Sequence, residues 1–427
     1  MNILVLGSGG REHAIVCSLA DSPRAERIFV APGNGGSAPG VVRAELDQMD
    51  GAAVVAFAEA NEVGLVVIGP EAPLVAGVAD AVRAADIPCF GPGAAGALIE
   101  GSKQFSKDLM LKYEIPTAEY AVFEDEASAL AYLARHPAPI VVKANGLAAG
   151  KGVTVAETND EAVEAVRACF GGRFGSAGAK VIIEEYMTGP ECSLLAFVDG
   201  RHMLPMVPAQ DHKRALEGDK GPNTGGMGVY SPVPIVSELE LGEMIALMQK
   251  TVDALISEGI DYKGVLYGGF MLTSTGPRVL EFNARFGDPE TQVVLPLLTS
   301  DLVTVMLACS KGELDQCELQ WHDRWAASVV LASASYPESY ETGKPITGIE
   351  AAEALENVTV FHAGTRRDVS GAVLTNGGRV LNVTALGSSF QDAREQAYRA
   401  VDLIDFEGKI YRRDIGERAL RGRNAWE

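Results

Sequence analysis

Two lysines, a glycine-rich loop and a pair of oxygen ligands are the residues of this chain best suited to chemistry. Lys143 ends an apolar run, and the loop that follows ends in Gly150, Lys151 and Gly152. An ammonium group offsets phosphate charge, and glycine amides donate hydrogen bonds without steric hindrance. The spacing is not that of a P-loop, because Gly152 stands where a Ser or Thr would follow the lysine. We predict a nucleotide-phosphate site, with an ordinary glycine-rich hairpin as the alternative.

The candidate metal ligands Glu281 and Asn283 lie two residues apart in a strand-like run, so their side chains share one face. Two oxygen ligands suit magnesium, which completes its shell with water and phosphate. Arg285, next on that face, suits a carboxylate or a transferring phosphoryl group. Phe282 and Phe286 bracket the polar set, which disfavours the alternative of a solvated surface strand.

A second strand-like run, 181–185, leads into a turn rich in carboxylates. A strand end offers backbone donors and acceptors to an adenine edge, and a later carboxylate can accept ribose hydroxyls. An ordinary strand with a polar exit is the alternative. The candidate ATP-binding residues here are Glu184, Glu185, Tyr186, Met187 and Glu191.

Two donor-rich stretches, 210–214 and 221–228, lack hydrophobic periodicity. Such loops carry function more often than cores do, although a solvated connector is the alternative. The candidate substrate-binding residues, including one that follows the metal-site strand, are Asp211, Lys213, Asn223, Thr224, Gly225, Gly226 and Asp288.

Residues 1–101 alternate short apolar runs with helical patterns, which predicts a parallel, doubly wound sheet. Strands are expected at 2–7, 27–31 and 65–69, and helices at 12–21, 51–61 and 75–85. Ligands bind at the carboxyl ends of such strands, and a helix N-terminus suits phosphate. The candidate substrate-binding residues at these ends are Gly9, Gly10, Arg11, Glu12, His13 and Glu71.

After a helix that opens at Lys103, the pattern changes to mixed α+β. Residues 117–188 predict a small unit that can move as a lid, with one helix introduced by the capping box from Thr158 to Glu161. The expected strands are 120–123, 139–144, 181–185, 326–332, 358–363 and 379–385, and the expected helices include 126–135, 301–311 and 390–401. We therefore expect a multidomain α/β and α+β chain, with a Rossmann-like domain at 1–101, a central domain at 102–323 and a small C-terminal α+β domain at 324–427.

The composition is that of a globular enzyme, with 47% hydrophobic and 22% charged residues. The formal charge of -21 argues against a nucleic-acid partner. No basic leader or membrane-length apolar run is present, which favours a cytoplasmic protein without a membrane partner. The six cysteines lack metal-ligand spacing, so we expect reduced, mostly buried thiols, with a disulfide or zinc site as the alternative.

The order of these motifs resembles the ATP-grasp superfamily, and within it the glycinamide ribonucleotide synthetase family. The matching stretches span almost the whole chain: GSGGREHA from Gly7, APGNGG from Ala31, GPEAPLVAG from Gly69, FGP from Phe90, EGSK from Glu100, QDHKR from Gln210, GPNTGGMG from Gly221, EFNARFGDPETQ from Glu281, FHAGT from Phe361 and TNGGRVL from Thr375. The resemblance implies that ATP is held between two α+β subdomains, under a glycine-rich lid loop.

The resemblance also implies a reaction, in which ATP drives the ligation of glycine to phosphoribosylamine in de novo purine biosynthesis. The glycine carboxylate would attack the γ-phosphoryl group to give glycyl phosphate, which the amine converts to glycinamide ribonucleotide. Lys103, Lys143 and Arg285 would stabilise the phosphates and the transferring group, with Mg²⁺ or Mn²⁺ on Glu281 and Asn283. The implied partners are small molecules, with no obligatory protein partner, so a monomer or weak homodimer is expected.

One departure concerns a second metal site. Many ATP-grasp enzymes carry another acid on the preceding strand, whereas this chain has Gly268 within 267–270 and no acid there. A second site would need phosphate, water or a carboxylate such as Glu290.

Two other functions fit parts of the chain. A dinucleotide-dependent oxidoreductase is suggested by the glycines after the first strand, but Glu12 replaces the third glycine of GxGxxG and no acid ends the second strand. A non-catalytic nucleotide-binding module is disfavoured by the two lysines and the metal-ligand pair.

Overall fold

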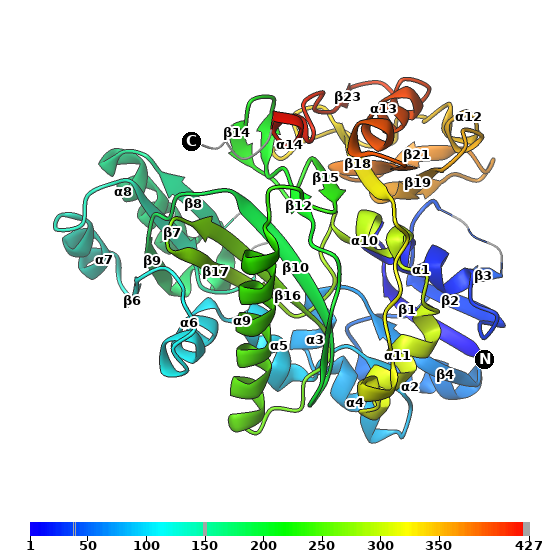
Figure 1. Ribbon diagram of the computed structural model, residues 1–427, viewed down its shortest axis with the longest axis horizontal. Helices are drawn as coiled ribbons and strands as arrows, with labels where there is room; N and C mark the ends of the chain where they lie inside the picture. Colours follow the sequence, from blue (N-terminus) through cyan, green and yellow to red (C-terminus); the bar gives the residue numbers. More distant parts are fainter. Residues whose placement is uncertain (37, 39, 148–151, 422–427) are drawn as a thin grey trace.

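The computed structural model describes residues 1–36, 38, 40–147 and 152–421. Gly150 and Lys151 of the expected phosphate loop lie outside the described residues. Figure 1 shows the parallel N-terminal sheet at one side, the lid strands at the other, and the C-terminal helices and strands above the central sheet.

The N-terminal sheet is parallel throughout, in the order β3-β2-β1-β4-β5, which confirms the predicted Rossmann-like unit. Its strands are β1 (Asn2–Gly7), β2 (Arg27–Pro32), β3 (Val41–Arg43), β4 (Val63–Ile68) and β5 (Cys89–Phe90). Apolar residues of β1 and β4 are fully buried between helices, including α1 (Gly10–Ala20) and α2 (Gly51–Ala60).

The helix expected at 75–85 is wrong in its bounds. Two short helices stand there, α3 (Glu71–Val75) and α4 (Val78–Ala84). Gly77 separates them with φ of 82°, in the left-handed region that interrupts a helix. The first helix therefore begins at Glu71, directly after the end of β4.

Residues 117–188, predicted to move as a lid and called the lid below, contain a four-stranded antiparallel sheet in the order β6-β9-β7-β8 with its own apolar core. The strands are β6 (Tyr120–Phe123), β7 (Ile140–Ala144), β8 (Val153–Ala156) and β9 (Val181–Glu185), packed with α7 (Glu126–Leu133) and α8 (Asn159–Ala168). The capping box of Thr158 and Glu161 starts α8 as predicted. A separate core is what a small unit needs to pack by itself.

The central sheet has the order β11-β10-β16-β17. Its strands are β10 (Glu191–Asp199), β11 (Met203–Pro205), β16 (Lys263–Thr273) and β17 (Gly276–Asn283). Helix α9 (Glu238–Ser257) covers one face, where Met244 and Met248 pack with Phe270 and Phe282. The polar residues of alternate positions therefore lie on the other face.

The C-terminal sheet has the order β12-β15-β18-β22-β19, with β23 also paired to β18. Its strands are β12 (Gln210–Asp211), β15 (Gly228–Ser231), β18 (Trp325–Ser333), β19 (Val358–His362), β22 (Arg379–Gly387) and β23 (Lys409–Ile410). The pairing of β15 with β18 brings a segment of the central part into the C-terminal sheet. Sequence patterns did not indicate this exchange, because strand pairing is a long-range property.

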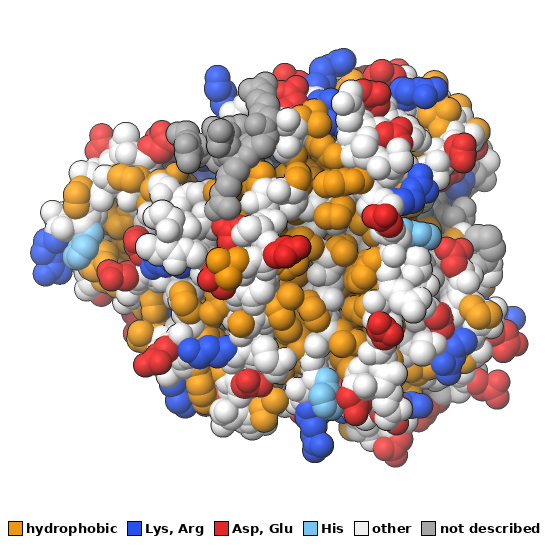
Figure 2. Space-filling view, in the orientation of Figure 1, with side chains coloured by type: hydrophobic (Ala, Val, Ile, Leu, Met, Phe, Trp, Pro, Cys, Tyr) orange, Lys and Arg blue, Asp and Glu red, His pale blue; other side chains and the backbone are white. Residues whose placement is uncertain are grey.

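The remaining elements connect these sheets. They are α5 (Ala94–Gly101), α6 (Lys103–Lys112), β13 (Arg214–Leu216), β14 (Lys220–Asn223), α10 (Thr291–Leu297), α11 (Leu302–Lys311), α12 (Ile349–Glu353), β20 (Thr365–Arg367), β21 (Val373–Thr375), α13 (Phe390–Val401) and α14 (Glu417–Arg421). The face in Figure 2 mixes acidic and basic side chains with hydrophobic ones between them.

Two features of the composition can be checked directly. All six cysteines are free thiols, and four are buried, as expected. Within the described residues, no helix combines the length and the apolar character needed to cross a bilayer.

Candidate active site

A buried carboxylate of the lid lies between two lysines. Glu184 on β9 places Oε2 at 2.9 Å from Nζ of Lys143 and 3.1 Å from Nζ of Lys107. Burial lowers the pKa of Lys107 to about 8, although Glu184 opposes this effect. Burial also lowers the pKa of Lys143, but Glu184 and Glu281 outweigh it and the net shift is upward. Oε1 of Glu184 is buried without a hydrogen-bond partner, so the cluster has an unused acceptor.

Lys103 begins helix α6 and contacts the start of the glycine loop. Its backbone N–H donates to the carbonyl of Asn145 at 3.0 Å, and its Nζ donates to the carbonyl of Gly146 at 3.3 Å. Burial lowers the pKa of Lys103, an effect that Glu281 opposes and Lys143 reinforces. The two candidate catalytic lysines are therefore close enough to influence each other, although they come from different elements.

Glu281 and Asn283 do share one face of β17, where they pair across to Gly269 and Tyr267 of β16. Burial raises the pKa of Glu281, but Lys143, Lys213 and Lys103 outweigh it, so the carboxylate is ionised. An ionised, half-buried carboxylate with a neighbouring amide oxygen fits a hard divalent cation. No group of three His, Cys, Asp or Glu side chains suited to a metal occurs in the part of the chain that the structure describes.

The position opposite Glu281 on β16 is Gly269, and Gly268 faces the other way. A Cβ added to Gly268 would lie 2.6 Å from Sδ of Met248, on the face covered by α9. On these two strands the candidate metal ligands are therefore Glu281 and Asn283.

Arg285 follows the metal-site strand and is held by carboxylates. Nη2 donates to Oε1 of Glu100 at 2.7 Å, and Nε lies 3.4 Å from Oε2 of Glu71. Nη2 also lies 3.4 Å from Oδ1 of Asn283. Burial lowers the pKa of Arg285, but Glu100 and Glu71 outweigh it, so the guanidinium stays charged. Glu100 was not predicted as a site residue, although it begins the matching stretch EGSK.

The donor-rich loops converge on Lys213. Its Nζ lies 3.1 Å from Oδ1 of Asp211 and 3.4 Å from Oε2 of Glu191. Thr224 secures the second loop, since its hydroxyl donates to the carbonyl of Lys213 and accepts from the N–H of Gly226. These sequence-predicted residues therefore do lie together.

Other predicted residues point elsewhere. The carboxylate of Glu185 pairs with Arg278 of β17 at 2.9 Å, and Tyr186 is exposed. Met187 packs in a small apolar cluster, and Asn223 pairs with Arg214 in the β13–β14 hairpin.

The N-terminal turn already contains carboxylates at the start of α1. Oε2 of Glu12 accepts the N–H of Gly9 at 2.6 Å, and Oε1 accepts from Nε of Arg11 at 2.5 Å. Oδ2 of Asp288 accepts the N–H of Arg11 at 3.4 Å. A Cβ on Gly69 would overlap Glu12, so this side chain fills the space between β1 and β4. The turn is therefore less electropositive than a free helix N-terminus.

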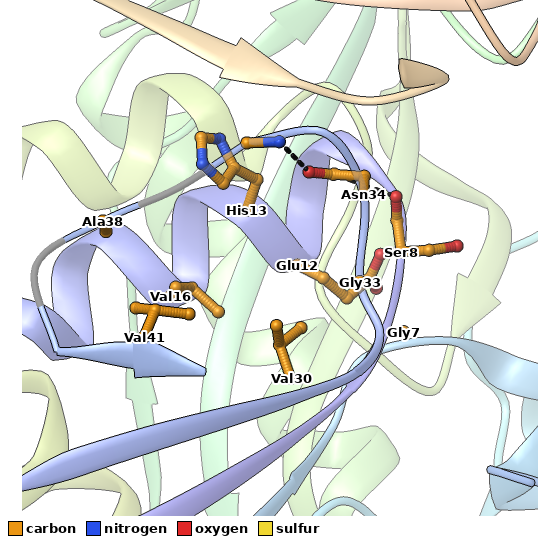
Figure 3. Close-up of a pocket in the computed structure, with 11 residues that line it drawn as sticks. Gly7, Ser8, Glu12, His13, Val16, Val30, Gly33, Asn34, Ala38 and Val41 are labelled. Atoms are coloured by element: carbon orange, nitrogen blue, oxygen red, sulfur yellow. Dashed lines mark hydrogen bonds between the residues drawn. The ribbon is translucent and has the colours of Figure 1, made fainter. Parts of the chain in front are cut away.

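His13 and Asn34 join the N-terminal domain to the C-terminal sheet. Nδ1 of His13 accepts the N–H of His362 at 3.0 Å, and burial lowers the pKa of His13 to about 4, which keeps the ring neutral. Nδ2 of Asn34 donates to the carbonyl of His362 at 2.7 Å. Figure 3 shows Glu12 and His13 on the helix above Val30, beside Asn34.

A cavity of about 520 Å³ lies where the N-terminal turn meets the C-terminal sheet. Arg43 of β3 and Arg379 of β22 contribute positive charge to its lining. Nη1 of Arg379 donates to the carbonyls of Gly225 at 2.6 Å and Asp288 at 2.8 Å, so this arginine also joins the loops. The lining residues are Ser8, Gly9, Gly10, Pro32, Gly33, Asn34, Arg43, Asp288, Tyr336, Tyr340, Ala363, Gly364, Thr365, Asn376, Gly378 and Arg379.

Neither arginine was predicted as a site residue. Arg43 lies in no motif with a phosphate-binding spacing, whereas Arg379 lies in the matching stretch TNGGRVL. The cavity brings Gly9, Gly10 and Asp288 of the predicted set together. It is lined mainly by polar side chains and backbone, which suits a small polar ligand.

Comparisons with known proteins cover nearly the whole chain. Three family models match: the phosphoribosylglycinamide synthetase N domain at residues 1–100, its ATP-grasp (A) domain at 101–291 and its C domain at 326–418. A phosphoribosylamine–glycine ligase from Allochromatium vinosum is 52% identical over 425 residues, covering 98% of this chain and 99% of the relative. Its counterpart from Mesorhizobium japonicum is 49% identical over 421 residues, covering 98% and 99%.

Solved structures agree with these matches. The crystal structure of phosphoribosylamine–glycine ligase from Thermotoga maritima superposes with a TM-score of 0.84 at 33% identity, covering 97% of this chain and 100% of that one. The biotin carboxylase domain of 2-oxoglutarate carboxylase from Hydrogenobacter thermophilus has a TM-score of 0.73 at 14% identity, covering 96% and 91%, and so shares the fold alone. With all three domain models matched in order and close relatives aligned from end to end, the chain belongs to the phosphoribosylglycinamide synthetase family.

Proposed function

We propose that this ATP-dependent ligase joins glycine to phosphoribosylamine through a glycyl phosphate intermediate, giving glycinamide ribonucleotide, ADP and phosphate. The observation that carries the proposal is the convergence of Lys143, Glu281 and Arg285 between the lid and the central sheet. Phosphoryl transfer to a carboxylate requires charges of this kind: two lysines, an ionised carboxylate that can hold a metal, and a guanidinium fixed in place.

ATP is proposed to bind between the lid and the central sheet. The phosphates would contact Lys103, Lys143, Gly150, Lys151 and Gly152. The adenine would lie near Glu184, whose buried Oε1 has no hydrogen-bond partner. The exocyclic amine of adenine would donate a hydrogen bond to this oxygen. The strand exit at Glu185, Tyr186 and Met187 would supply backbone contacts, and Glu191 would accept the ribose hydroxyls.

Glu281 and Asn283 would hold Mg²⁺ or Mn²⁺. The ionised state of Glu281 suits magnesium, which retains phosphate and water ligands. The metal would neutralise phosphate charge and orient the transferring group.

Arg285 is proposed to stabilise the phosphoryl group as it transfers to the glycine carboxylate. Its guanidinium is fixed by Glu100 and Glu71 and needs no rearrangement during the reaction. The lid would exclude water, since an acyl phosphate hydrolyses if water reaches it before the amine. The amine would then displace phosphate from the carbonyl carbon.

Phosphoribosylamine is proposed to occupy the 520 Å³ cavity. Oε2 of Glu12 already accepts the hydrogen bond from the N–H of Gly9. We therefore place the phosphate of the substrate near Arg43 and Arg379 rather than at the start of α1. Gly9 and Gly10 would then contact the ligand through backbone. The other candidates for this substrate and for glycine are Arg11, Glu12, His13, Glu71, Asp211, Lys213, Asn223, Thr224, Gly225, Gly226 and Asp288.

The domain boundaries at 101/102 and 323/324, with the lid at 117–188, belong to the same proposal, as does cytoplasmic action as a monomer or weak homodimer on small molecules. Separate sheets for the N-terminal unit and the lid support the 101/102 boundary and the lid.

A phosphate-release assay tests the activity. Phosphate and ADP should form in equal amounts only when glycine, phosphoribosylamine, ATP and magnesium are all present. Release that is independent of glycine, or a product without the glycyl group, would contradict the proposal. Omission of each substrate in turn is the control.

A further inference from the structure

The β13–β14 hairpin is held by a segment near the end of the chain. Nη1 of Arg412 lies 2.8 Å from Oδ1 of Asp219 in the hairpin turn, and Nη2 lies 2.8 Å from Oδ2 of Asp414. The same Oδ2 accepts the N–H of Gly218 in that turn at 2.8 Å. Arg412 is 2% exposed, although Gly218 is at the surface. A buried guanidinium with a carboxylate on each side therefore joins the hairpin to the C-terminal segment.

The chain on both sides of Lys213 is tied to the same segment. Nη1 of Arg412 donates to the carbonyl of Arg214 at 3.0 Å. Nε2 of His212 accepts the N–H of Gly416 at 3.0 Å. Burial lowers the pKa of His212 to about 4 and the charge of Arg412 adds to this effect, so the neutral ring can accept. Lys213 therefore lies between two residues that the C-terminal segment holds.

The ammonium group of Lys213 is placed by this backbone. Its carbonyl accepts from the N–H of Thr224 at 2.7 Å and from the hydroxyl at 2.8 Å. Its Nζ lies 3.1 Å from Oδ1 of Asp211 and 3.4 Å from Oε2 of Glu191. A displacement of roughly 1 Å would break contacts of this kind, and in an active site such a displacement can cost on the order of 10²-fold in rate.

We propose that Arg412 is a positioning residue for the ligase reaction, which holds Lys213 in the active site through the hairpin turn and the carbonyl of Arg214. Arg412 acts through Lys213, because its guanidinium contacts the hairpin and Asp414. The kinetic part of this inference rests on the proposed function, in which Lys213 is a candidate substrate-binding residue. The C-terminal segment thus helps to build the active site from outside it.

Limited proteolysis of Asp219→Asn tests the hairpin contact without any activity measurement. Asparagine keeps the shape and tolerates the φ of 52° at this position, but it removes the charge that faces Arg412. Trypsin should cleave after the exposed Lys220 of β14 at least about fivefold faster in the variant, because the turn opens more often. Arg413→Lys is the matched control, since the side chain at 413 is exposed over the ring of Tyr411, and its cleavage rate should equal that of the wild type.

Arg412→Lys tests whether the contact reaches the active site. Lysine keeps the charge but lacks the planar fork that holds two carboxylates and a carbonyl, so kcat/KM should fall about tenfold or more. The variant should change kcat and the three KM values in the same pattern as Lys213→Met. Arg413→Lys should keep the wild-type constants. Thermal melts establish that each variant is folded, and the partly exposed Asp219→Asn replaces Arg412→Lys if the latter does not fold.

A double-mutant cycle separates positioning from general stability. Adding Arg412→Lys to Lys213→Met should lower kcat/KM by less than about twofold further, because the ammonium through which Arg412 acts is already gone. A purely structural residue would lower the rate by the same factor in both backgrounds. That outcome would make the assignment of Arg412 wrong.

The remaining results overturn separate claims. Wild-type rates in Lys213→Met would show that its ammonium is not the group being positioned. An unchanged cleavage rate in Asp219→Asn would show that the ion pair does not hold the hairpin. A wild type that forms no ADP with glycine and phosphoribosylamine would overturn the proposed function, whereas the cleavage rates would still decide the hairpin contact.

Discussion

Nη2 of Arg285 lies 2.7 Å from Oε1 of Glu100, while Oε2 of the same carboxylate accepts the N–H of Ala284 at 2.7 Å. One glutamate on α5 therefore fixes both the backbone and the side chain of the segment that leaves the metal-site strand. The guanidinium is pre-organised by the fold, before any substrate arrives.

Arg285→Ala should lower kcat on the order of 10²-fold or more, the usual effect of removing a group that stabilises transition-state charge. The KM for ATP should change little, because the two lysines remain. Initial rates with each substrate varied in turn measure both constants. Arg285→Lys keeps the charge without the planar fork and should recover only part of the rate. A loss confined to ATP binding would place Arg285 in the nucleotide site instead.

The same variant should acquire a new pH dependence of stability. Burial raises the pKa of Glu100, and Arg285 opposes that rise. Without the arginine the folded-state pKa increases further above the unfolded value of about 4.3. A raised carboxyl pKa contributes stability that is present below the unfolded pKa and is lost as pH rises through the folded one.

Urea unfolding should therefore show that Arg285→Ala loses more stability than the wild type between about pH 5 and pH 8. Adding Glu100→Gln should abolish the extra pH dependence. If the free energy of unfolding depends on pH in the same way in the wild type and in Arg285→Ala, Glu100 and Arg285 are not coupled.

Glu281→Gln should keep the fold and lower activity on the order of 10²-fold, because a neutral amide places the cation poorly. The magnesium concentration for half-maximal rate should rise. Glu119→Gln on the exposed lid surface is a matched control. Wild-type turnover at low magnesium would remove Glu281 from the metal site.

Glu184→Gln should weaken ATP binding about tenfold. The change removes the carboxylate that supports the charge on Lys107 and Lys143, and the pKa of Lys107, already lowered to about 8 by burial, should fall further. Equilibrium titration with a fluorescent ATP analogue measures the affinity. Unaltered affinity would show that the cluster is purely structural.

Arg43→Ala should raise the KM for phosphoribosylamine several-fold. The effect should be larger at low salt, because salt screens the attraction between an exposed arginine and an anion. The KM values for ATP and glycine should not change. Arg201→Ala, an exposed arginine in a turn outside the cavity, is the control. Equal effects of the two variants would argue against phosphate near Arg43.

Local patterns predicted individual elements well. The bounds of β1, β6, β9 and α13 match the expected ranges, and Thr158 starts α8 as its capping box indicated. These features depend on side chains a few residues apart, where hydrophobic period and capping act directly.

The long-range contacts of the site were not predictable in this way. Glu100 pairs with a residue 185 positions away, and Arg43 and Arg379 meet at one cavity from opposite parts of the chain. The hydrogen bond from the N–H of Gly9 to Oε2 of Glu12, in the turn predicted to bind phosphate, was likewise not predicted. Such contacts depend on how sheets pack together, which no local period records.

The pairing of β15 with β18 has a consequence for how this chain can be divided. A cut near residue 323 would leave Gly228–Ser231 as an unprotected edge on one fragment and expose the partner strand on the other. The C-terminal part is therefore not a module that can be deleted or exchanged by itself. If the chain were cut there, the two fragments would be soluble and active only when they bind each other and re-form the shared sheet.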